Sequence, residues 1–511
     1  MRPWVASVPR RDTPHFHPAG VAAADPFVTG AARHRLERGA ASYTVFYGDL
    51  HRHSSLSRCS RGIEPMPEDR YAAARDVWRD DFLAVTDHAG HMDPAAWARL
   101  GRLLAFERTP TLLPLRGYEC STQSQGHFNV IFATVDAPLL SIASNPREGA
   151  LDWLSRRLAD REALVIPHTS ADPGRLVDFR ECDPRLTRLV EVYQSLRGSF
   201  EFDGCWRQSA RALKPGSFAA DALAVLPQLG FIASSDHGNG AAYAAVLAER
   251  LDAPSLFAAL TAGRCFATTL RGLLVDLRVG DAWMGESVVV TAPPVIRLAT
   301  RMVQPIRDVL VVKDGRPWQR LGRDAEPAQR ELNLHFELDE ASVPPRRDFA
   351  LELELAGGRL VLGGAAARGR DPTRPGFEPL DREDEGAAAG IRWRWPKGAR
   401  HTNRDGYRLR ARVTRDASFT VGTGAARREV GLAEALRDGL SGQSQGCNWS
   451  VRVHERHDLG VAEQPGLGVA ELVHEWSDEE LPAGASATYY VRVIQADGEC
   501  AWSSPIRVTR R

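Results

Sequence analysis

The stretch YGDLHRHSSLSRC, residues Tyr47–Cys59, follows a short apolar run and carries two histidines spaced as His-x-His. Alternate side chains of a strand face the same side, so we expect His51 and His53 to point one way and Arg52 the other. Two imidazoles aimed at one point suggest a pair of metal ligands. Two polar residues at the end of a strand would look the same, so further ligands are needed to decide between these interpretations.

The length and charge of the chain restrict its class. A chain of 511 residues is too long for one ordinary core, and two or three domains are expected. Lys+Arg and Asp+Glu both total 65, so the formal net charge is zero and neither a nucleic-acid nor a membrane partner is predicted. No stretch resembles a signal peptide or a membrane span. Seven cysteines without a Cys-x-x-Cys pair favour a reduced, cytoplasmic protein.

Up to about residue 283, short apolar runs alternate with amphipathic segments. Continuous apolar runs are typical of strands buried on both faces, as in parallel sheets. The strand candidates are Val45–Leu50, Phe82–Thr86, Thr111–Tyr118, Phe128–Thr134, Ala163–Pro167, Leu189–Tyr193 and Phe231–Ser234. Helical candidates lie between them, for example PMPEDRYAAARDVW, in which Pro67 suits the first helical position. Repeated strand–helix units predict an α/β barrel or a doubly wound sheet.

After about residue 284 the chain becomes β-rich. The segment TYYVRVIQADGECAWSSPIRV predicts a hairpin with its turn at residues 496–499, and a β-sandwich is the expected architecture. His335 and His454 in this part show no partner ligands and are interpreted as surface residues. The predicted division is an N-terminal extension over residues 1–40, an α/β domain over 41–283 and a β-rich domain over 284–511.

Metal-capable side chains stand at the ends of almost all the apolar strands of the first half. Sites in α/β folds are built at the carboxyl ends of the strands, where these side chains fall. Nitrogen and oxygen ligands without a thiolate cluster suit Zn²⁺, Mn²⁺ or Fe²⁺. Their number exceeds the four that one zinc ion needs, so two or three ions are predicted. The residues are His51, His53, His88, Glu119, His127, His168, Asp236 and His237.

The motifs Gly-Asp-Leu-His-Arg-His, Thr-Asp-His, Pro-His-Thr and Ser-Asp-His together resemble the PHP (polymerase and histidinol phosphatase) superfamily. The chain looks most similar to an uncharacterised bacterial branch, domain of unknown function 3604, through Gly-Tyr-Glu, His-x-Asn-Val at 127–130, CFATT at 265–269 and YYVRVIQADG near the end. The resemblance spans roughly residues 43 to 511. It implies a distorted seven-stranded α/β barrel that usually carries three catalytic metal ions.

The family pattern implies a specific ligand set and exposes two departures from it. At the position of Cys59 the family usually has Asp or His; a thiolate there would bind zinc, but the residue could equally be inert. His237 directly follows Asp236, whereas the family pattern is Asp-x-His, so the two side chains point apart unless a loop brings His237 back. The implied ligands are His51, His53, His88, Glu119, His127, His168 and Asp236.

Other residues are assigned roles around the metals. Asp49 shares a side with His51 and would orient a ligand imidazole. Arg52, Tyr193 and Arg197 lie at the predicted metal-bearing rim and are candidates for binding a phosphorylated small molecule. His88 and His237 are the candidate ligand-shell histidines for protonating the leaving group, a role that a metal-bound water could also fill.

The sequence therefore predicts a metal-dependent hydrolase, and the resemblance points to a phosphoesterase in which a metal-activated hydroxide attacks phosphorus. A metal-dependent amidohydrolase also uses His-x-His in an α/β barrel and is the second enzyme candidate. A third alternative is a protein without catalysis, in which metals stabilise the barrel and the β-rich domain binds a ligand. Neither the substrate nor the oligomeric state follows from the sequence.

Overall fold

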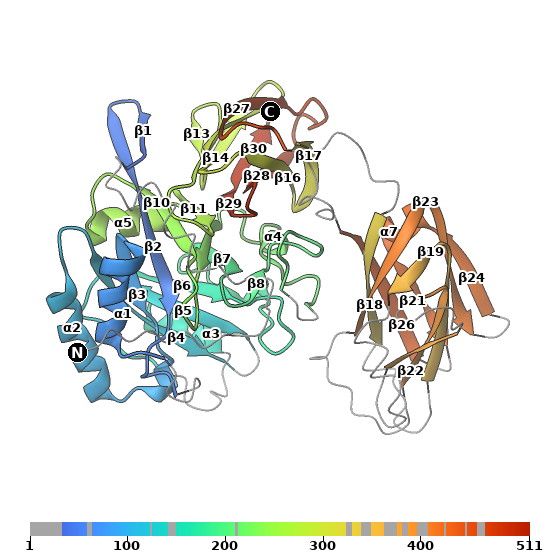
Figure 1. Ribbon diagram of the computed structural model, residues 1–511, viewed down its shortest axis with the longest axis horizontal. Coiled ribbons are helices and arrows are strands. Elements are labelled where there is room, and N and C mark those ends of the chain that lie inside the picture. Colours follow the sequence, from blue (N-terminus) through green and yellow to red (C-terminus); the bar gives the residue numbers. More distant parts are fainter. Residues whose placement is uncertain are drawn as a thin grey trace.

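A computed structural model gives the structure of the chain (Figure 1). It describes residues 33–58, 64–122, 125–141, 150–209, 213–322, 330–338, 349–361, 376–380, 387–395, 407–423, 426–444, 447–456 and 466–511. The fold is mixed α/β, with many strands and few, mostly short helices. Of the predicted N-terminal extension, residues 1–32 lie outside the described residues.

All seven strands expected in the first half are present. They are β2 (Ala41–Arg52), β3 (Phe82–Val85), β4 (Leu113–Ser121), β5 (His127–Phe132), β6 (Ala163–His168), β7 (Leu189–Gln194) and β9 (Gly230–Ser234). Strands β2, β3 and β4 are parallel, β5 is antiparallel to both β4 and β6, and β7 is parallel to β9. A parallel bridge between Arg52 and Asp236 joins the end of β2 to the end of β9. The carboxyl ends of β2 and β9 therefore meet.

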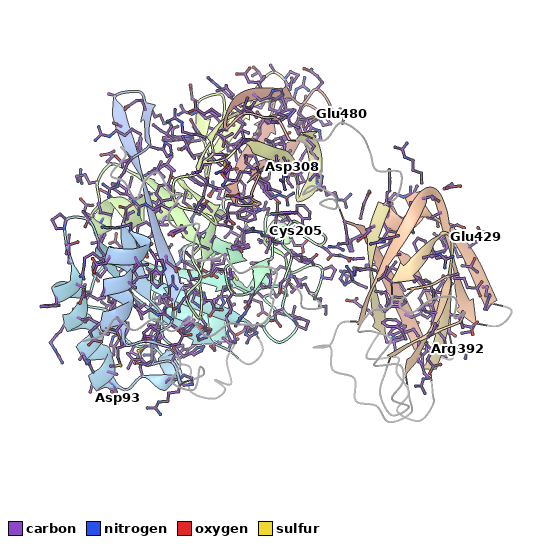
Figure 2. All side chains as sticks on the ribbon, in the orientation of Figure 1. Asp93, Cys205, Asp308, Arg392, Glu429 and Glu480 are labelled. Atoms are coloured by element: carbon purple, nitrogen blue, oxygen red, sulfur yellow. The ribbon has the colours of Figure 1, made fainter. Side chains whose placement is uncertain are left out.

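The helices that cover these strands begin at residues that favour the start of a helix. Pro67 occupies the first turn of α1 (Pro67–Ala73), as predicted, since its missing N–H costs nothing there. Asp93, labelled in Figure 2, precedes α2 (Pro94–Glu107). Its side chain caps this helix by accepting a hydrogen bond from the Ala96 N–H. The apolar face of α2 is buried in the core. The other helices are α3 (Ala150–Arg157), α4 (Ala219–Ala222) and α5 (Ala253–Thr261).

The last strands of the chain return to the sheet of the first half. β10 (Tyr243–Ala248) pairs with β2, β11 (Cys265–Thr268) pairs with β10, and β29 (Cys500–Ser503) pairs with β11. The predicted hairpin is present: β28 pairs with β29, and the Gln495 N–H donates a hydrogen bond to the Glu499 carbonyl across the expected turn. The same sheet includes β1 (Arg35–Arg38), β14 (Ser287–Val290), β16 (Ile306–Lys313), β17 (Arg316–Leu321), β28 (Ser486–Gln495) and β30 (Ile506–Arg510).

Two smaller sheets complete this body. One follows the order β13 (Ala282–Trp283), β12 (Leu274–Val279), β15 (Val295–Arg301) and β27 (Glu471–Ser477), and the other is β8 (Gly198–Ser199), β7 and β9. Strand pairing therefore crosses residue 283, the boundary predicted between the second and third domains, because β12 lies before it and β15 after it.

The described residues between 330 and 456 form a separate β body with its own hydrophobic core (Figure 1). It contains β18 (Arg330–Leu338), β19 (Phe349–Val361), β20 (Gly376–Pro379), β21 (Ala387–Ala388), β22 (Gly390–Trp395), β23 (Tyr407–Thr423), β24 (Ala426–Gly431), α7 (Leu432–Asp438), β25 (Leu440–Ser444) and β26 (Cys447–Glu455). Arg392 and Glu429 mark it in Figure 2.

This β body contacts the first half through a buried polar cluster. The Asp203 carboxylate accepts hydrogen bonds from Asn333 Nδ2 at 2.9 Å and His335 Nε2 at 2.6 Å. His335 is buried, so its interpretation as a surface residue was wrong: its strand faces the first half of the chain. In the part of the chain that the structure describes, no helix is long and apolar enough to cross a bilayer.

The returning C-terminal strand is tied to the first half by a buried ion pair. Arg492 Nη1 lies 2.7 Å from Glu201 Oε2, both side chains have zero exposure, and the Tyr490 hydroxyl donates to the other carboxylate oxygen. We expect Arg492→Met to lower the free energy of unfolding by about 3–5 kcal/mol, because it leaves the Glu201 charge buried without its partner. Urea denaturation followed by circular dichroism measures this loss.

A matched variant tests whether burial causes the effect. Arg301 and Glu471 form a similar pair at 2.8 Å, but both side chains are more than half exposed. Arg301→Met should therefore leave the denaturation midpoint unchanged. Equal, small effects of the two substitutions would contradict the structural role assigned to Arg492.

Candidate metal centre

The predicted ligands converge at one end of the strands of the first half. His51 and His53 come from the end of β2 and its continuation, and His168 ends β6. Because β5 is antiparallel, its first residue lies at the same end, and His127 faces His168 across the β5–β6 pair. His88 follows β3 and forms a parallel bridge with Glu119 of β4. Strand ends that are distant in the chain therefore bring these side chains to one end of the strands.

Three overlapping groups of side chains have ligand atoms close enough to share a metal ion. Within each group the ligand atoms lie within 4.8 Å of one another. Because His51 and His53 each belong to two groups, the three groups form one continuous cluster. The groups are His53, His88 and His237; His51, Glu119 and His168; and His51, His53 and Asp236.

Two carboxylates compensate the buried imidazoles at the centre of the cluster. Glu119 Oε2 lies 2.9 Å from His53 Nε2, and Asp236 Oδ1 lies 3.4 Å from the same atom. Burial alone would lower the pKa of His53, but hydrogen bonds and charge from Asp236 and Glu119 outweigh it and raise the pKa to about 9. Conversely, burial would raise the pKa of Glu119, but the neighbouring His168 and His88 hold it well below its usual value.

The imidazole nitrogens that face away from the centre are held by other protein groups. His51 Nδ1 lies 2.9 Å from Glu191 Oε1, and His53 Nδ1 lies 2.7 Å from Ser57 Oγ. His237 Nδ1 lies 3.2 Å from Glu64 Oε1. Binding one ring nitrogen in this way fixes the ring and leaves the other for a metal, which is the usual arrangement around ligand histidines. His51 Nε2 and His53 Nε2 accordingly lie 3.2 Å apart.

His237 joins the cluster because of an unusual backbone conformation at the residue before it. Asp236 has a φ of 64°, in the left-handed region that non-glycine residues rarely adopt. The chain therefore turns after β9 instead of continuing as a strand. The His237 ring stacks on His53 with 3.9 Å between centroids and 10° between planes. The loop that the sequence required to bring His237 back is thus present.

His88 and His127 approach Glu119 from its outer side. His127 Nδ1 lies 2.7 Å from Glu119 Oε1, and Ser121 Oγ lies 3.0 Å from His88 Nδ1. Both rings are partly exposed, so the cluster opens to solvent on this side. Burial lowers the pKa of His88 to about 3, which keeps its imidazole neutral. His127 contacts Glu119 but belongs to none of the three groups.

Asp49 was predicted to orient a ligand imidazole, but its side chain contacts backbone groups and Arg52 instead. Its Oδ1 accepts hydrogen bonds from the backbone N–H groups of His51 and Ser235, and its Oδ2 lies 3.2 Å from Arg52 Nε. Burial raises the pKa of Asp49. Its contacts therefore brace the ends of β2 and β9, while Glu191 occupies the place next to the His51 ring.

The three predicted substrate contacts have different surroundings. Arg52 is buried, with its guanidinium 4.0 Å from the Trp78 ring and bonded to the Gly238 carbonyl. Tyr193 stacks on Trp502 within the core. Arg197 alone of these three contacts the cluster, with Nη1 3.3 Å from Asp236 Oδ2. Cys59 lies outside the described residues, so its role stays a prediction.

A bulge in β7 explains why Glu191, which was not predicted as a site residue, lies beside the cluster, and why Tyr193, a predicted substrate contact, does not. The β7–β9 pairing shifts register between Glu191 and Tyr193, so strict alternation of side chains fails there. As a result, Gln194 joins Glu191 beside His51, with 2.6 Å between Gln194 Nε2 and Glu191 Oε2, while Tyr193 enters the core. The sequence signal for Glu191 was an acid inside a continuous apolar strand, where an unpaired charge would be costly.

The cluster fits a bound metal. His168 Nε2 is buried and forms no hydrogen bond among the described residues, with Glu119 Oε1 3.4 Å away. Native proteins rarely leave buried polar atoms without a partner, so this atom points to a missing ligand. Imidazole nitrogens and carboxylate oxygens together are a donor set for divalent ions such as zinc and manganese.

Comparison with known proteins gives weak likenesses only. No protein-family model matches the chain, and no curated protein matches it. The solved structure of PsfC from Pseudomonas syringae PB-5123 aligns with 40% of this chain and 82% of its own, at 18% identity and a TM-score of 0.26. A two-domain protein from Bacteroides vulgatus ATCC 8482, described as containing a predicted PHP-like metal-dependent phosphoesterase, aligns with 78% of this chain and 99% of its own, at 13% identity and a TM-score of 0.32. Scores this low do not establish a shared fold.

The contact between Glu191 and His51 gives a prediction for metal affinity. We expect Glu191→Gln to weaken Zn²⁺ binding by about 10- to 100-fold, because the ring of His51 loses the carboxylate that orients it. Competition with a chromogenic chelator measures the affinity, and circular dichroism checks the fold. Glu162→Gln removes an exposed carboxylate elsewhere in the first half and should leave the affinity unchanged. Equal affinities for both variants would show that Glu191 does not support the centre.

Proposed function

We propose that the chain is a metal-dependent hydrolase of the PHP superfamily that acts on phosphoesters. The observation that carries the proposal is the convergence of the Nε2 atoms of His51 and His53 on Glu119 and Asp236, with each outer Nδ1 held by another side chain. The assignment to phosphate chemistry and to this superfamily rests on the resemblance of the motifs that supply these residues.

We further propose that the seven strands β2, β3, β4, β5, β6, β7 and β9 form the distorted barrel that the resemblance implies. The observed order supports this, since each strand pairs with the next up to β6 and the bridge between Arg52 and Asp236 brings the last strand back to the first. Val165 N–H also bonds to the Leu186 carbonyl, which ties β6 to the segment that leads into β7. A C-terminal β-sandwich is likewise proposed, with the core of residues 330–456 as its support.

Two or three divalent ions would be held by the three overlapping groups, with His127 as an additional ligand next to Glu119. When bound, such ions lower the pKa of water, so that hydroxide forms near neutral pH, and they neutralise charge on phosphoryl oxygens. Zinc, manganese and iron all suit these ligands. If Cys59 also binds, its thiolate would favour zinc.

The residues of the chain would divide the remaining tasks. Arg197 lies beside Asp236 with its side chain partly exposed, so its guanidinium can bind a phosphoryl oxygen at the edge of the cluster. His237 borders the same cluster and is also partly exposed, which suits it to deliver a proton to the departing oxygen, whereas the neutral imidazole of His88 is suited to binding a metal. Asp49 would contribute by fixing the backbone of His51.

The substrate would be a phosphorylated small molecule, and no nucleic-acid partner is proposed. A reducing compartment such as the cytoplasm is also proposed. The six cysteines among the described residues are all buried and free of disulfides, which supports a protein that does not depend on oxidation for its stability.

Metal content and turnover test the proposal together. Protein purified without chelators should contain two or three equivalents of Zn, Mn or Fe by elemental mass spectrometry. His51→Ala should lose at least one equivalent, because His51 belongs to two of the three groups, whereas His474→Ala in β27 should lose none. Cys59→Ala should lose one equivalent only if the thiolate is a ligand.

The same preparations should hydrolyse members of a panel of phosphomonoesters and phosphodiesters. Chelation should abolish hydrolysis, and added Mn²⁺ or Zn²⁺ should restore it. Hydrolysis of amides but not phosphoesters would favour the amidohydrolase alternative. Retention of metal without turnover of phosphoesters, esters or amides would favour the non-catalytic alternative.

Arg197 provides a separate test of phosphate recognition. We expect Arg197→Met to raise KM for an active phosphoester roughly tenfold or more, because a charge-assisted hydrogen bond to the phosphoryl group is lost. Arg180→Met removes an exposed arginine of the same half and serves as the matched control. An unchanged KM in Arg197→Met with unchanged metal content would exclude the proposed contact.

A further inference from the structure

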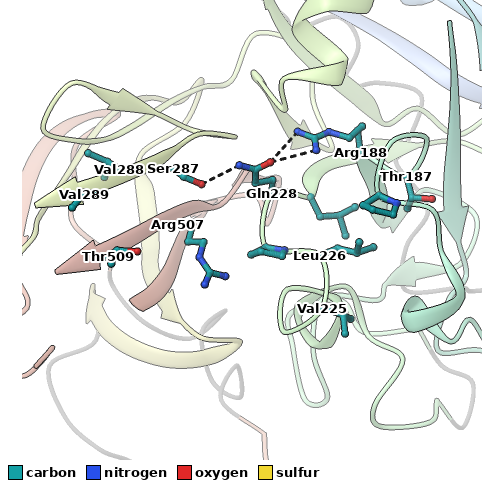
Figure 3. Close-up of a pocket in the computed structure, with 13 residues that line it drawn as sticks. Thr187, Arg188, Val225, Leu226, Gln228, Ser287, Val288, Val289, Arg507 and Thr509 are labelled. Atoms are coloured by element: carbon teal, nitrogen blue, oxygen red, sulfur yellow. Dashed lines mark hydrogen bonds between the residues drawn. The ribbon is translucent and has the colours of Figure 1, made fainter. Parts of the chain in front are cut away.

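A pocket lies away from the metal centre, where the first half of the chain meets the C-terminal strands (Figure 3). Its volume is about 390 Å³, within the range of roughly 300–1,000 Å³ that is typical of small-molecule sites. Three segments that are distant in sequence form its walls. They are residues 184–188, residues 225–229, and the neighbouring strands β14 and β30.

The pocket lies at the opposite end of the strands from the metals. Residues 184–188 precede β7 and residues 225–229 precede β9, whereas Glu191, Gln194 and Asp236 lie toward or beyond the carboxyl ends of these strands. β7 has six residues, which at about 3.3 Å each separates its two ends by roughly 20 Å. A ligand in this pocket would therefore not reach the candidate metal ligands.

The charged residues that line the pocket are two arginines, Arg188 and Arg507, and no carboxylate lines it. Thirteen residues line it, and neither aspartate nor glutamate is among them. Among the described residues, Arg188 bonds only to neutral oxygens, the Thr261 carbonyl at 2.9 Å and the Gln228 side-chain oxygen at 3.4 Å. The guanidinium of Arg507 makes no hydrogen bond or ion pair in the part of the chain that the structure describes, and it points into the pocket in Figure 3.

Two acids that adjoin the pocket walls in the sequence are engaged with other partners. Glu286, whose backbone carbonyl accepts a hydrogen bond from the Arg507 N–H, uses one carboxylate oxygen for Arg38 and the other for the Trp283 N–H. Asp183, which precedes the pocket wall, pairs with Arg185 at 2.7 Å. Partial burial lowers the pKa of Arg188, and no carboxylate opposes this effect.

The remaining walls offer apolar and neutral polar contacts. Leu226 is buried, Pro227 and Val288 are half-buried, and Val225 is 45% exposed. Gln228 links Arg188 to Ser287 by hydrogen bonds (Figure 3), so the arginine is held in place before any ligand binds. A partly apolar pocket with a few fixed polar groups is the usual form of a small-molecule site.

We propose that this pocket binds a small organic anion, with its phosphate, phosphonate or carboxylate group on Arg507 and its apolar part against Val225, Leu226 and Val288. The Arg507 guanidinium, which makes no hydrogen bond or ion pair among the described residues, supplies the donors that such an oxyanion accepts, and Arg188 adds positive charge to the same pocket. The site is separate from the candidate metal centre and does not depend on the hydrolase function proposed above.

Isothermal titration calorimetry with phenylphosphonate tests the proposal on the full chain. This probe carries an oxyanion and an apolar ring and has no ester bond to hydrolyse. We expect saturable binding to the wild type, and binding at least about tenfold weaker in Arg507→Gln, which loses one charged donor. Arg511→Gln removes an exposed arginine near the pocket that does not line it, and it should bind as the wild type does.

Two further variants separate the outcomes. Val288→Asp places a carboxylate in the apolar wall and should abolish binding by charge repulsion, while His53→Ala alters the metal centre and should leave binding at the pocket unchanged. Binding that survives Arg507→Gln and Val288→Asp but is lost in His53→Ala would place the probe on the metals and overturn the proposal. So would the absence of binding to the wild type, or an equal loss in Arg507→Gln and Arg511→Gln.

Discussion

The structure of the first half depends on one electrostatic constraint, the burial of several ionisable side chains at a single point. His51, His53, Glu119 and Asp236 are all at most 2% exposed, and each would be costly to bury alone. They are tolerable together because the carboxylates lie against the imidazoles, which raises the pKa of His53 and depresses those of Glu119 and Asp236. The strand order, the outer ring of hydrogen bonds and the turn after β9 all serve to keep these charges in contact.

The strands of the first half and the members of the cluster could be predicted because both leave local signals in the sequence. A continuous apolar run identifies a buried strand, and a histidine or acid at the end of such a run is conspicuous. The observed strands begin and end within a few residues of the expected positions, as in β6 (Ala163–His168) and β7 (Leu189–Gln194). His127 at the start rather than the end of its strand is explained by the antiparallel direction of β5.

The errors arose where local signals are absent. A register shift in β7 places Tyr193 in the core and Gln194 beside Glu191, and no residue type marks such a shift. The left-handed conformation of Asp236, which decides where His237 points, is likewise not visible in a sequence without glycine at that position. Tertiary pairing was also hidden: nothing in the hairpin near the end of the chain indicates that it would bond to β11 rather than to its own half.

The return of the C-terminal hairpin has a consequence for how the protein is made. On the ribosome, β11 emerges long before β29, the strand that covers its edge, and the whole β body of residues 330–456 is synthesised in between. Until then, β11 presents unpaired backbone groups, a condition that favours association with other chains. The β body has its own core and can fold before β29 is synthesised. Nascent chains should therefore pass through a stage in which the β body is folded while the edge of β11 is still unpaired.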